Sequence, residues 1–302
     1  MVKNLDEVFN KAKEYTTQKV SVAAAEDKEV LIALKEAAEN EICEPILVGD
    51  EKKIKEIADE LNFDVSSYKI INESEPAKAS QMAVKLVNQG EADTVMKGHV
   101  QTRDLLKAVL DKENGLRTGN ILSHIAILDV PEYDKLLFLT DAAMNIAPDL
   151  DQKVNIVQNS VDIANDMNIE KPKVAPLAAV EVVNPDMEAT KEAALLSKMA
   201  DRGQIKNAHV DGPLALDNAI SKEAAAQKKI DSPVAGDADI LLVPDIEAGN
   251  ILYKSLTHLA KGQIAGIIAG AKTPVILTSR ADPHEAKVYS IAAACMMMAN
   301  RK

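Results

Sequence analysis

The chain has 302 residues, of which 47% are hydrophobic and 27% are charged, and its formal net charge is −12. At about 150 residues per domain, this length predicts two domains with apolar cores of their own. The acidic balance disfavours binding to nucleic acid or to anionic lipid, because both recruit positive charge. The chain has no Trp and only 3% aromatic residues, which also disfavours base stacking.

The cysteine pattern and the N-terminus indicate the cellular compartment. Cys43 and Cys295 are too far apart in sequence for a CxxC motif, and both lie in apolar surroundings. We expect two small core residues in a reducing compartment. Segment 1–15 is charged and shows no secretory signal, and no apolar run reaches the ~18 residues of a membrane span. These features predict a cytoplasmic protein that contacts no membrane.

Short apolar runs alternate with amphipathic stretches along the first part of the chain. We expect strands at 20–25, 45–49, 68–72 and 92–98, and helices at 27–40, 51–61, 75–90 and 102–113. Such alternation predicts a parallel sheet with helices on both faces. Gly90 is suited to end the third of these helices, because glycine readily adopts the left-handed conformation.

The pattern changes in the middle of the chain. The apolar runs 121–130 and 135–142 follow each other without a helix, which predicts a hairpin or an excursion between domains. Beyond them we expect helices at 149–166, 189–201, 214–227, 248–259 and 283–299, and strands at 173–180, 207–212, 239–246, 263–270 and 273–280. No linker rich in Pro, Gly or Ser divides the chain, so two α/β domains joined by crossing strands fit the sequence best.

Polar residues follow several of the predicted strand ends. In doubly wound sheets, ligands bind beyond the carboxyl ends of the strands, near helix N-termini. The candidates for substrate binding are Lys97, Thr102, Asp141, Asn145, Asn184, Asp211, Glu247 and Asn250. A solvated lysine, turn formation or helix capping would explain several of these positions as well as ligand contact does.

The sharpest combination is Ser279 with Arg280, which lies between an apolar strand and a helix. Asp282 is suited to cap this helix, Pro283 to its first position, and Glu285 to completing a capping box. A hydroxyl and a guanidinium beside a helix N-terminus can bind a phosphate or a developing oxyanion. A capped turn with a surface arginine would explain the same residues without a function.

Other motifs are missing. Neither GxGxxG nor GxxxxGK[ST] occurs, and the five histidines lack metal-ligand spacing. His124 and His209 fall inside predicted strands, so we expect both in the core. The sequence therefore predicts no metal and no bound cofactor.

The chain resembles the phosphate acetyl/butyryltransferase family, and most closely its butyryl branch, in the segments VMKGHVQT, FLTDAAMNIAPDL, AAVEVVNP, LLSKMADRGQIKNAHVDGPLALDNAIS, PDIEAGNILYKSL and PVILTSRADPHEAK. The similarity runs from about residue 20 to the C-terminus. It implies reversible transfer of a short acyl group between CoA and inorganic phosphate. The CoA thioester, phosphate and acyl phosphate would be substrates, and an acyl (butyrate) kinase would be the functional neighbour.

The resemblance also implies a fold similar to that of the isocitrate/isopropylmalate dehydrogenases. Two three-layer α/β/α domains would enclose a cleft, in a homodimer or a higher homo-oligomer. Residues 1–128 and 275–302 would form the first domain, because the C-terminal strand and helix return to it, and residues 129–274 would form the second.

By the same resemblance, a base removes the CoA thiol proton and the thiolate attacks the acyl phosphate carbonyl in a ternary complex. Ser279 would donate to the carbonyl oxygen, and Arg280 would hold the phosphoryl group or the phosphate of CoA. Ala286 stands where the acetyltransferase members carry an aspartate that is proposed as the base. Glu285 is our candidate for this role and His284 a weaker one, although one step along a helix turns a side chain by about 100°.

Three alternatives stay open. The transferase could prefer acetyl groups or accept branched chains broadly, because an added methylene changes discrimination by only ~1–3 kcal/mol. A dehydrogenase related by fold could bind a divalent metal through Asp237, Asp239 and Asp245. A non-catalytic sensor of acyl phosphate or CoA would bind its ligand without turnover.

Overall fold

The computed structural model describes residues 2–279 and 282–301. By its internal packing the chain divides into two compact units. Met1–Asn4 and Ile121–Ile264 form one, here the middle unit, and Leu5–Asn120 and Ala265–Lys302 form the other, here the terminal unit. The C-terminal helix thus packs with the N-terminal part of the chain. Residues 121–128, which the sequence-based boundaries placed in the first domain, pack within the middle unit.

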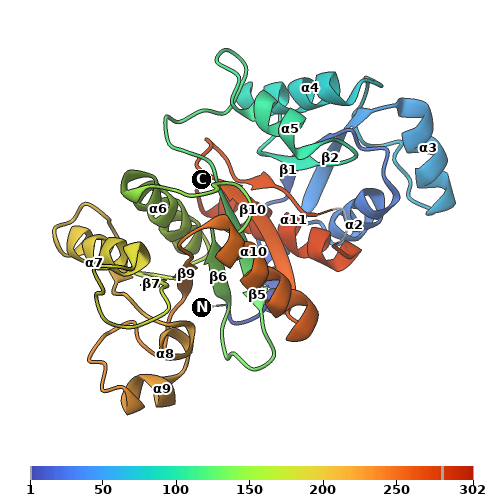
Figure 1. Ribbon diagram of the computed structural model, residues 1–302. Coiled ribbons are helices and arrows are strands. Elements are labelled where there is room, and N and C mark those ends of the chain that lie inside the picture. Colours follow the sequence, from blue (N-terminus) through green and yellow to red (C-terminus); the bar gives the residue numbers. More distant parts are fainter. Residues whose placement is uncertain (1, 280–281, 302) are drawn as a thin grey trace. The chain divides into compact units, whose positions relative to one another are not determined.

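The terminal unit is built on parallel strands in the order β3-β2-β1-β4-β11, with β10 antiparallel to β11. The strands are β1 (Gln18–Ala23), β2 (Cys43–Gly49), β3 (Ile70–Asn72), β4 (Thr94–Lys97), β10 (Gln263–Ala269) and β11 (Val275–Ile276). The helices are α1 (Leu5–Ala12), α2 (Lys28–Glu39), α3 (Glu51–Glu60), α4 (Pro76–Asn88), α5 (Thr102–Val109) and α11 (His284–Asn300). Helices α4 and α5 cover one face of these strands, and α2 and α11 cover the other (Figure 1).

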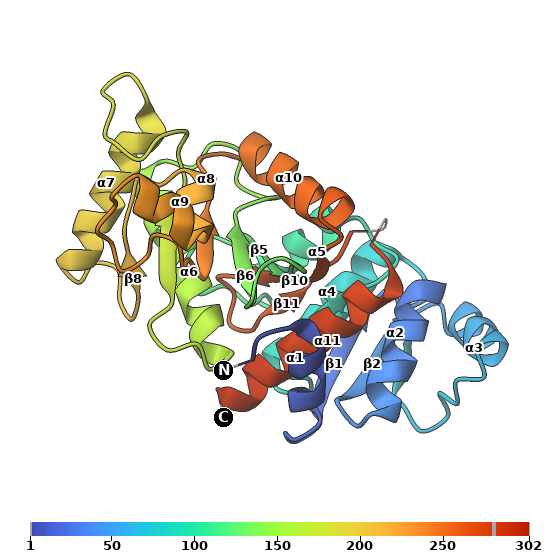
Figure 2. The same ribbon diagram turned by 90° about the horizontal axis from the view of Figure 1, so that it is seen from below.

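Helix α11 holds the second of these faces together. It packs against both α1 and α2 (Figure 2). Its consecutive small residues Ala292, Ala293 and Ala294 are all buried, which lets the neighbouring helices approach closely. Cys295 and Cys43 are buried as well, so the expectation of two core cysteines is confirmed. Burial raises the pKa of Cys43 to about 12, which keeps it an unreactive thiol.

The middle unit has the strand order β5-β6-β9-β7-β8. Its strands are β5 (Ser123–Asp129), β6 (Leu137–Thr140), β7 (Lys173–Pro176), β8 (His209–Val210) and β9 (Ile240–Leu242). Its helices are α6 (Leu150–Asp166), α7 (Glu188–Asp201), α8 (Leu216–Ile220), α9 (Lys222–Gln227), α10 (Ile246–Lys254) and the π-helical turn η1 (Ser255–Leu259). Strands β5 and β6 pair antiparallel, so the expected hairpin is confirmed, and the other pairs are parallel.

Three expectations about the middle unit are wrong in detail. The helix expected over 214–227 is two helices, because Ser221 accepts the Ala224 N–H (3.2 Å) and starts a new one. The strand expected over 239–246 ends at Leu242, because Asp245 caps α10 by accepting the Ala248 N–H (2.8 Å). His209 is exposed, whereas His124 is buried as expected.

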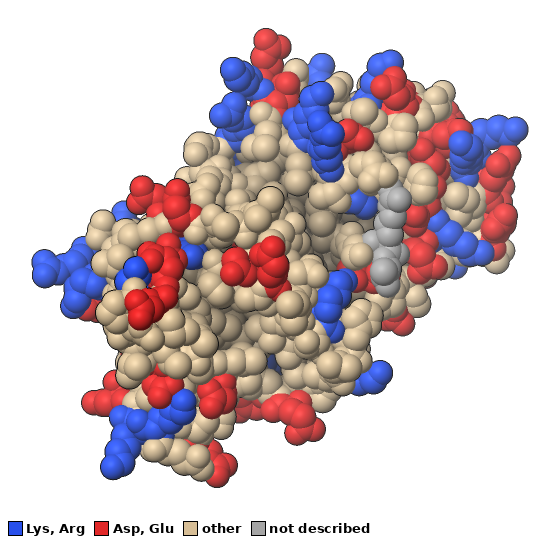
Figure 3. Space-filling view, viewed as in Figure 1, with Lys and Arg blue, Asp and Glu red and all other residues tan. Residues whose placement is uncertain are grey.

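The described residues include no helix with the length and apolar character needed to cross a membrane. On the face shown in Figure 3, acidic and basic side chains are interspersed over the surface.

Candidate active site

The carboxyl ends of β1, β2, β4 and β11 lie at one edge of the terminal unit's sheet, because these strands are parallel. The chain leaving β4 is pressed against the end of β1. The Gly98 N–H donates to Ala23 O (2.9 Å), and the His99 N–H donates to Ala24 O (2.6 Å). A Cβ on Gly98 would lie 2.2 Å from Ala24 O, so only glycine fits here. This packing fixes the backbone from which His99 projects.

His99 faces a carboxylate from another part of the chain. Its Nδ1 lies 3.5 Å from Asp27 Oδ2, and the His99 side chain is 59% exposed. The other oxygen of Asp27 accepts the Val30 N–H (3.0 Å) and caps α2. One carboxylate oxygen of Asp27 therefore caps α2, and the other faces the imidazole of His99.

Two predicted binding residues lie beside this pair. Lys97 ends β4 but is only 7% exposed, and its ammonium donates to Gly98 O (3.3 Å). We expected this ammonium to emerge at the edge of the sheet, whereas the side chain lies under the turn that follows. Thr102 is the first residue of α5 and is exposed.

The turn between β11 and α11 carries the predicted Ser279. Ser279 is exposed, and its N–H donates to Asp282 Oδ2 (2.7 Å), while the Asp282 N–H donates back to Ser279 O (3.2 Å). Buried Lys287 donates from Nζ to Asp282 O (3.0 Å). Arg280 lies outside the described residues, so its role stays a prediction.

The start of α11 differs from the expectation by one residue. Pro283 takes the N-cap position and the helix begins at His284, with no side-chain cap, so the predicted capping box is not formed. Glu285 is 54% exposed at its side chain, and its carboxylate lies 3.5 Å from His284 Nδ1. Ala286 is 3% exposed and belongs to the core. Glu285 and Ala286 thus face different surroundings, as their 100° separation on a helix requires.

In the middle unit, the predicted Asp141 is engaged by its own loop. It is 3% exposed, and its carboxylate accepts the N–H groups of Ala143 (3.0 Å), Met144 (3.0 Å) and Asn145 (3.2 Å). The Asn145 side-chain amide donates to Asp141 Oδ2 (2.5 Å) and to Leu122 O (2.9 Å). Asp141 therefore holds the loop that follows β6.

Helix α10 supports the same loop. The Asn250 side-chain amide donates to Ala142 O (3.3 Å). A Cβ on Gly249 would lie 2.8 Å from Asp141 O, so the helix and the loop are in close contact. Glu247 lies in the first turn of α10 and is exposed.

The two remaining candidates lie after β7 and β8. The Asn184 side chain accepts the Asp186 N–H (3.0 Å), and Asn184 O accepts the Thr190 hydroxyl (3.0 Å). Asp211 is half-buried, and its N–H donates to Val174 O (3.1 Å). The middle unit thus brings Asp141, Asn145 and Asn250 together and leaves these two at the ends of other strands.

Sequence reasoning missed the pair His99 and Asp27. The histidine follows a strand in the string MKGHVQT, which is a visible signal. Its carboxylate partner caps a helix 72 positions earlier in the chain, so pairing them requires the packing of β4 against β1.

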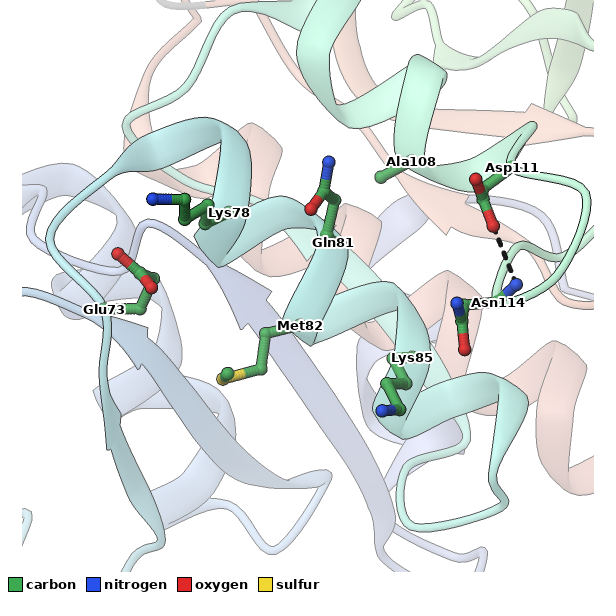
Figure 4. Close-up of a pocket in the computed structure, with 8 residues that line it drawn as sticks. All are labelled: Glu73, Lys78, Gln81, Met82, Lys85, Ala108, Asp111 and Asn114. Atoms are coloured by element: carbon green, nitrogen blue, oxygen red, sulfur yellow. Dashed lines mark hydrogen bonds between the residues drawn. The ribbon is translucent and has the colours of Figure 1, made fainter.

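The terminal unit also holds a cavity of about 380 Å³ between α4 and α5 (Figure 4). Its lining residues are Glu73, Lys78, Gln81, Met82, Lys85, Ala108, Asp111 and Asn114. Two lysines are balanced by two carboxylates, and one of these, Asp111, accepts the Asn114 N–H (2.8 Å). The predicted site residues do not line this cavity.

The acids considered for a dehydrogenase metal site serve the structure. Lys135 Nζ lies 2.6 Å from Asp239 Oδ1 and 3.0 Å from Asp237 Oδ1, and Lys173 also binds Asp237. Burial alone would raise the pKa of Asp237, but hydrogen bonds from Lys173 and Lys135 outweigh it and lower the pKa. The described residues contain no group of three or more His, Cys, Asp or Glu side chains placed to hold a metal ion.

The fold and the sequence together place the chain in a family of acyl-transferring enzymes. The chain belongs to the Phosphate acetyl/butaryl transferase family, which matches residues 4–81 and 73–295. The family expected from the motifs is thereby confirmed. The chain is 53% identical over 302 residues to the phosphate butyryltransferase of Clostridium beijerinckii, and the alignment covers 100% of both chains. It is 50% identical over 275 residues to a phosphate acetyltransferase of Thermotoga maritima, covering 91% of this chain and 93% of that one.

Solved structures agree with this assignment. A branched-chain phosphotransacylase from Enterococcus faecalis superposes with a TM-score of 0.84 at 37% identity, over 93% of this chain and 99% of that one. A 4-hydroxythreonine-4-phosphate dehydrogenase from Klebsiella pneumoniae shares the fold alone, with a TM-score of 0.54 at 12% identity, over 93% of this chain and 99% of that one. The expected α/β, dehydrogenase-like fold class is confirmed.

Proposed function

We propose that the chain is a phosphate butyryltransferase, which transfers a butanoyl group reversibly between CoA and inorganic phosphate. The observation that carries this proposal is the 53% identity to a phosphate butyryltransferase over the full length of both chains. In this reaction CoA and phosphate are substrates, so no separate cofactor is involved. The CoA thiolate attacks the carbonyl of butanoyl phosphate directly, and phosphate leaves.

The terminal unit supplies the groups at the reacting carbonyl. The Ser279 hydroxyl stabilises the developing negative charge on the carbonyl oxygen, and Arg280 holds the phosphoryl group. The exposure of Ser279 and the two hydrogen bonds that fix its backbone to Asp282 support this role. Thr102 opens α5, and the N-terminus of a helix favours an anion. The sequence analysis offers Glu285 as one candidate for the base, and its side chain is 54% exposed at the start of α11.

In the middle unit, the candidate substrate-binding residues include those of a loop that side-chain hydrogen bonds hold in place. Asp141 and Asn145 hold the loop after β6, and Asn250 ties α10 to it. These contacts support positioning of the loop, with Glu247, Asn184 and Asp211 as further polar groups that follow the neighbouring strands.

The same proposal extends to the setting of the enzyme. This chemistry fits a cytoplasmic homodimer or higher homo-oligomer whose acyl phosphate is the substrate of a butyrate kinase. Two buried free thiols support a reducing compartment.

A second candidate differs in the acyl group. The 50% identity to a phosphate acetyltransferase favours acetyl transfer, and the likeness to a branched-chain phosphotransacylase favours branched acyl groups, which isobutanoyl represents in the test. Since a methylene changes discrimination by only ~1–3 kcal/mol, the three substrates must be compared side by side.

The test measures thiol release from butanoyl-, isobutanoyl- and acetyl-CoA, each with and without phosphate. Phosphate-dependent release that is fastest with butanoyl-CoA supports the proposal. Faster release from acetyl-CoA or isobutanoyl-CoA keeps the reaction and changes the branch. Release without phosphate indicates a thioesterase. No turnover, combined with thermal stabilisation by CoA, indicates a sensor.

A further inference from the structure

In the unassigned pair of His99 and Asp27, His99 follows β4, the strand next to β11, which Ser279 follows. Strands β4 and β11 are parallel, with Ile276 opposite Met96. His99 is three residues past Met96, and Ser279 is three residues past Ile276, so both leave adjacent strands at the same level. Neighbouring strands are about 4.8 Å apart. Both side chains are exposed, so both are accessible at the same edge of the terminal unit's sheet.

The imidazole is held in the manner of a general base. Its backbone is fixed against β1 through the Gly98 and His99 N–H groups. Its Nδ1 faces the Asp27 carboxylate at 3.5 Å, a distance that catalytic hydrogen bonds often show before substrate binds. A carboxylate on Nδ1 leaves Nε2 as the proton acceptor and stabilises the imidazolium that forms. Asp27 is itself held in place because its other oxygen caps α2.

The other candidate positions fit the role less well. Ala286 carries no base and is buried. The Glu285 carboxylate lies 3.5 Å from Nδ1 of its sequence neighbour His284, whereas His99 is paired with a carboxylate from another element. Among side chains, imidazole has the ordinary pKa closest to neutrality, about 6.5, which suits it to take a proton from a thiol of ordinary pKa about 8.5.

We infer that His99 is the general base of the acyl transfer, oriented by Asp27; this inference rests on the proposed function. In the direction of thioester synthesis, Nε2 takes the proton from the CoA S–H as the sulfur forms its bond to the carbonyl carbon. The bond from that carbon to the phosphate oxygen breaks, and phosphate leaves with the electron pair. The imidazolium then returns its proton to phosphate or water. In the reverse direction, the imidazolium protonates the departing CoA thiolate.

The experiment measures kcat and KM for butanoyl phosphate plus CoA in six proteins. These are the wild type, His99→Asn, His99→Ala, Asp27→Asn, Glu285→Gln and the control His209→Asn, which alters an exposed histidine of the middle unit. Asparagine is as good an N-cap as aspartate, so Asp27→Asn keeps the cap on α2 and removes only the charge facing the imidazole. We expect His99→Asn to lower kcat by roughly 10²-fold or more and to leave KM within about threefold.

A smaller loss in kcat is expected for Asp27→Asn, about tenfold, and none for His209→Asn. His99→Ala should recover part of its activity on addition of free imidazole, which a merely structural role would not allow. All variants should unfold at the wild-type temperature within about 2 °C, because the altered side chains are exposed or keep their helix cap.

The inference and the proposed function fail in different ways. A wild type without phosphate-dependent CoA turnover overturns the proposed function. An active wild type whose His99→Asn variant keeps kcat within threefold overturns the inference alone. So does a loss in His99→Ala that imidazole does not restore, or a loss above 10²-fold confined to Glu285→Gln.

Discussion

The two units use their charged and polar side chains differently. In the terminal unit, ion pairs such as Lys55–Glu51 and Lys52–Glu56 lie exposed along single helices, and His99 and Ser279 are exposed at the ends of strands. In the middle unit, exposed pairs within one helix, such as Lys198–Asp201, occur beside buried charged contacts between elements. Lys153 of α6 pairs with Glu192 of α7, and Asp141 accepts three backbone N–H groups of its own loop.

This difference distinguishes polar groups that hold structure from polar groups that can contact a ligand. A polar group that protein donors already satisfy holds structure and is costly to remove, because it leaves buried donors without partners. An exposed polar group at a strand end adds little stability and is available to a ligand. We therefore expect chemistry in the terminal unit and a structural role for the buried polar groups of the middle unit, and the predictions below test this.

The largest expected effect tests the chemical role of the terminal unit. Ser279→Ala removes the proposed donor to the carbonyl oxygen, and loss of such a donor typically costs 10²–10³-fold in kcat. The unfolding temperature should stay the same, because the side chain is exposed. Steady-state kinetics and thermal unfolding check the two parts separately.

Ser67→Ala is the matched control, because Ser67 is an exposed serine in a turn of the same unit. It should match the wild type in both measurements. If Ser279→Ala retained more than a third of the wild-type kcat, the chemical role given to this strand end would be wrong.

The next effect tests the positioning role of the middle unit. Asp141→Ala should lower the free energy of unfolding by about 2–3 kcal/mol, because it leaves several buried donors unsatisfied. Asp141→Asn keeps one carbonyl oxygen and should cost less. Chemical denaturation of both variants measures this. Unchanged stability in Asp141→Ala, together with a higher KM, would instead indicate that Asp141 contacts the substrate.

Glu247→Ala serves as the comparison for stability, because Glu247 is an exposed acid of the same unit. Exposed substitutions usually change the free energy of unfolding by less than about 0.5 kcal/mol. A loss in Glu247→Ala equal to that in Asp141→Ala would remove the contrast between buried and exposed acids.

The sequence predicted the alternation of strands and helices because that signal is local. Asp50 and Ser221 illustrate how a single side chain that accepts a backbone N–H starts a helix. The start of α11 was placed one residue early, because the sequence favoured Asp282 as a cap while the chain uses Asp282 to hold Ser279. Helix caps and turns use the same residue types, so the amino-acid sequence alone does not distinguish a cap from a turn.

The candidate site was predictable in position and much less so in role. The strand ends identified Lys97 and Asp141 as polar residues, but burial under the following turn became visible only with the neighbouring elements in place. The pairing of His99 with Asp27 depends on β4 lying beside β1, a contact between distant segments. Periodicity and motif spacing carry no information about such contacts.

The smallest expected effect compares the two kinds of ion pair. The pKa of Asp237 is lowered by its hydrogen bonds from Lys173 and Lys135, which outweigh the opposing effect of burial. A carboxyl whose pKa is lower in the folded than in the unfolded chain adds stability above about pH 4, and this stability is lost as the pH falls through the folded-state value. Asp237→Asn should therefore destabilise the protein by about 1 kcal/mol at pH 7, since the pair is partly exposed, and less at pH 3.

Glu56→Gln, which breaks an exposed pair with Lys52 in the terminal unit, should leave the free energy of unfolding unchanged at both pH values. Urea unfolding at both pH values measures the difference. Equal losses in the two variants, or a loss in Asp237→Asn that is the same at pH 3 as at pH 7, would show that the charges of the middle unit stabilise it no more than the exposed pairs of the terminal unit do.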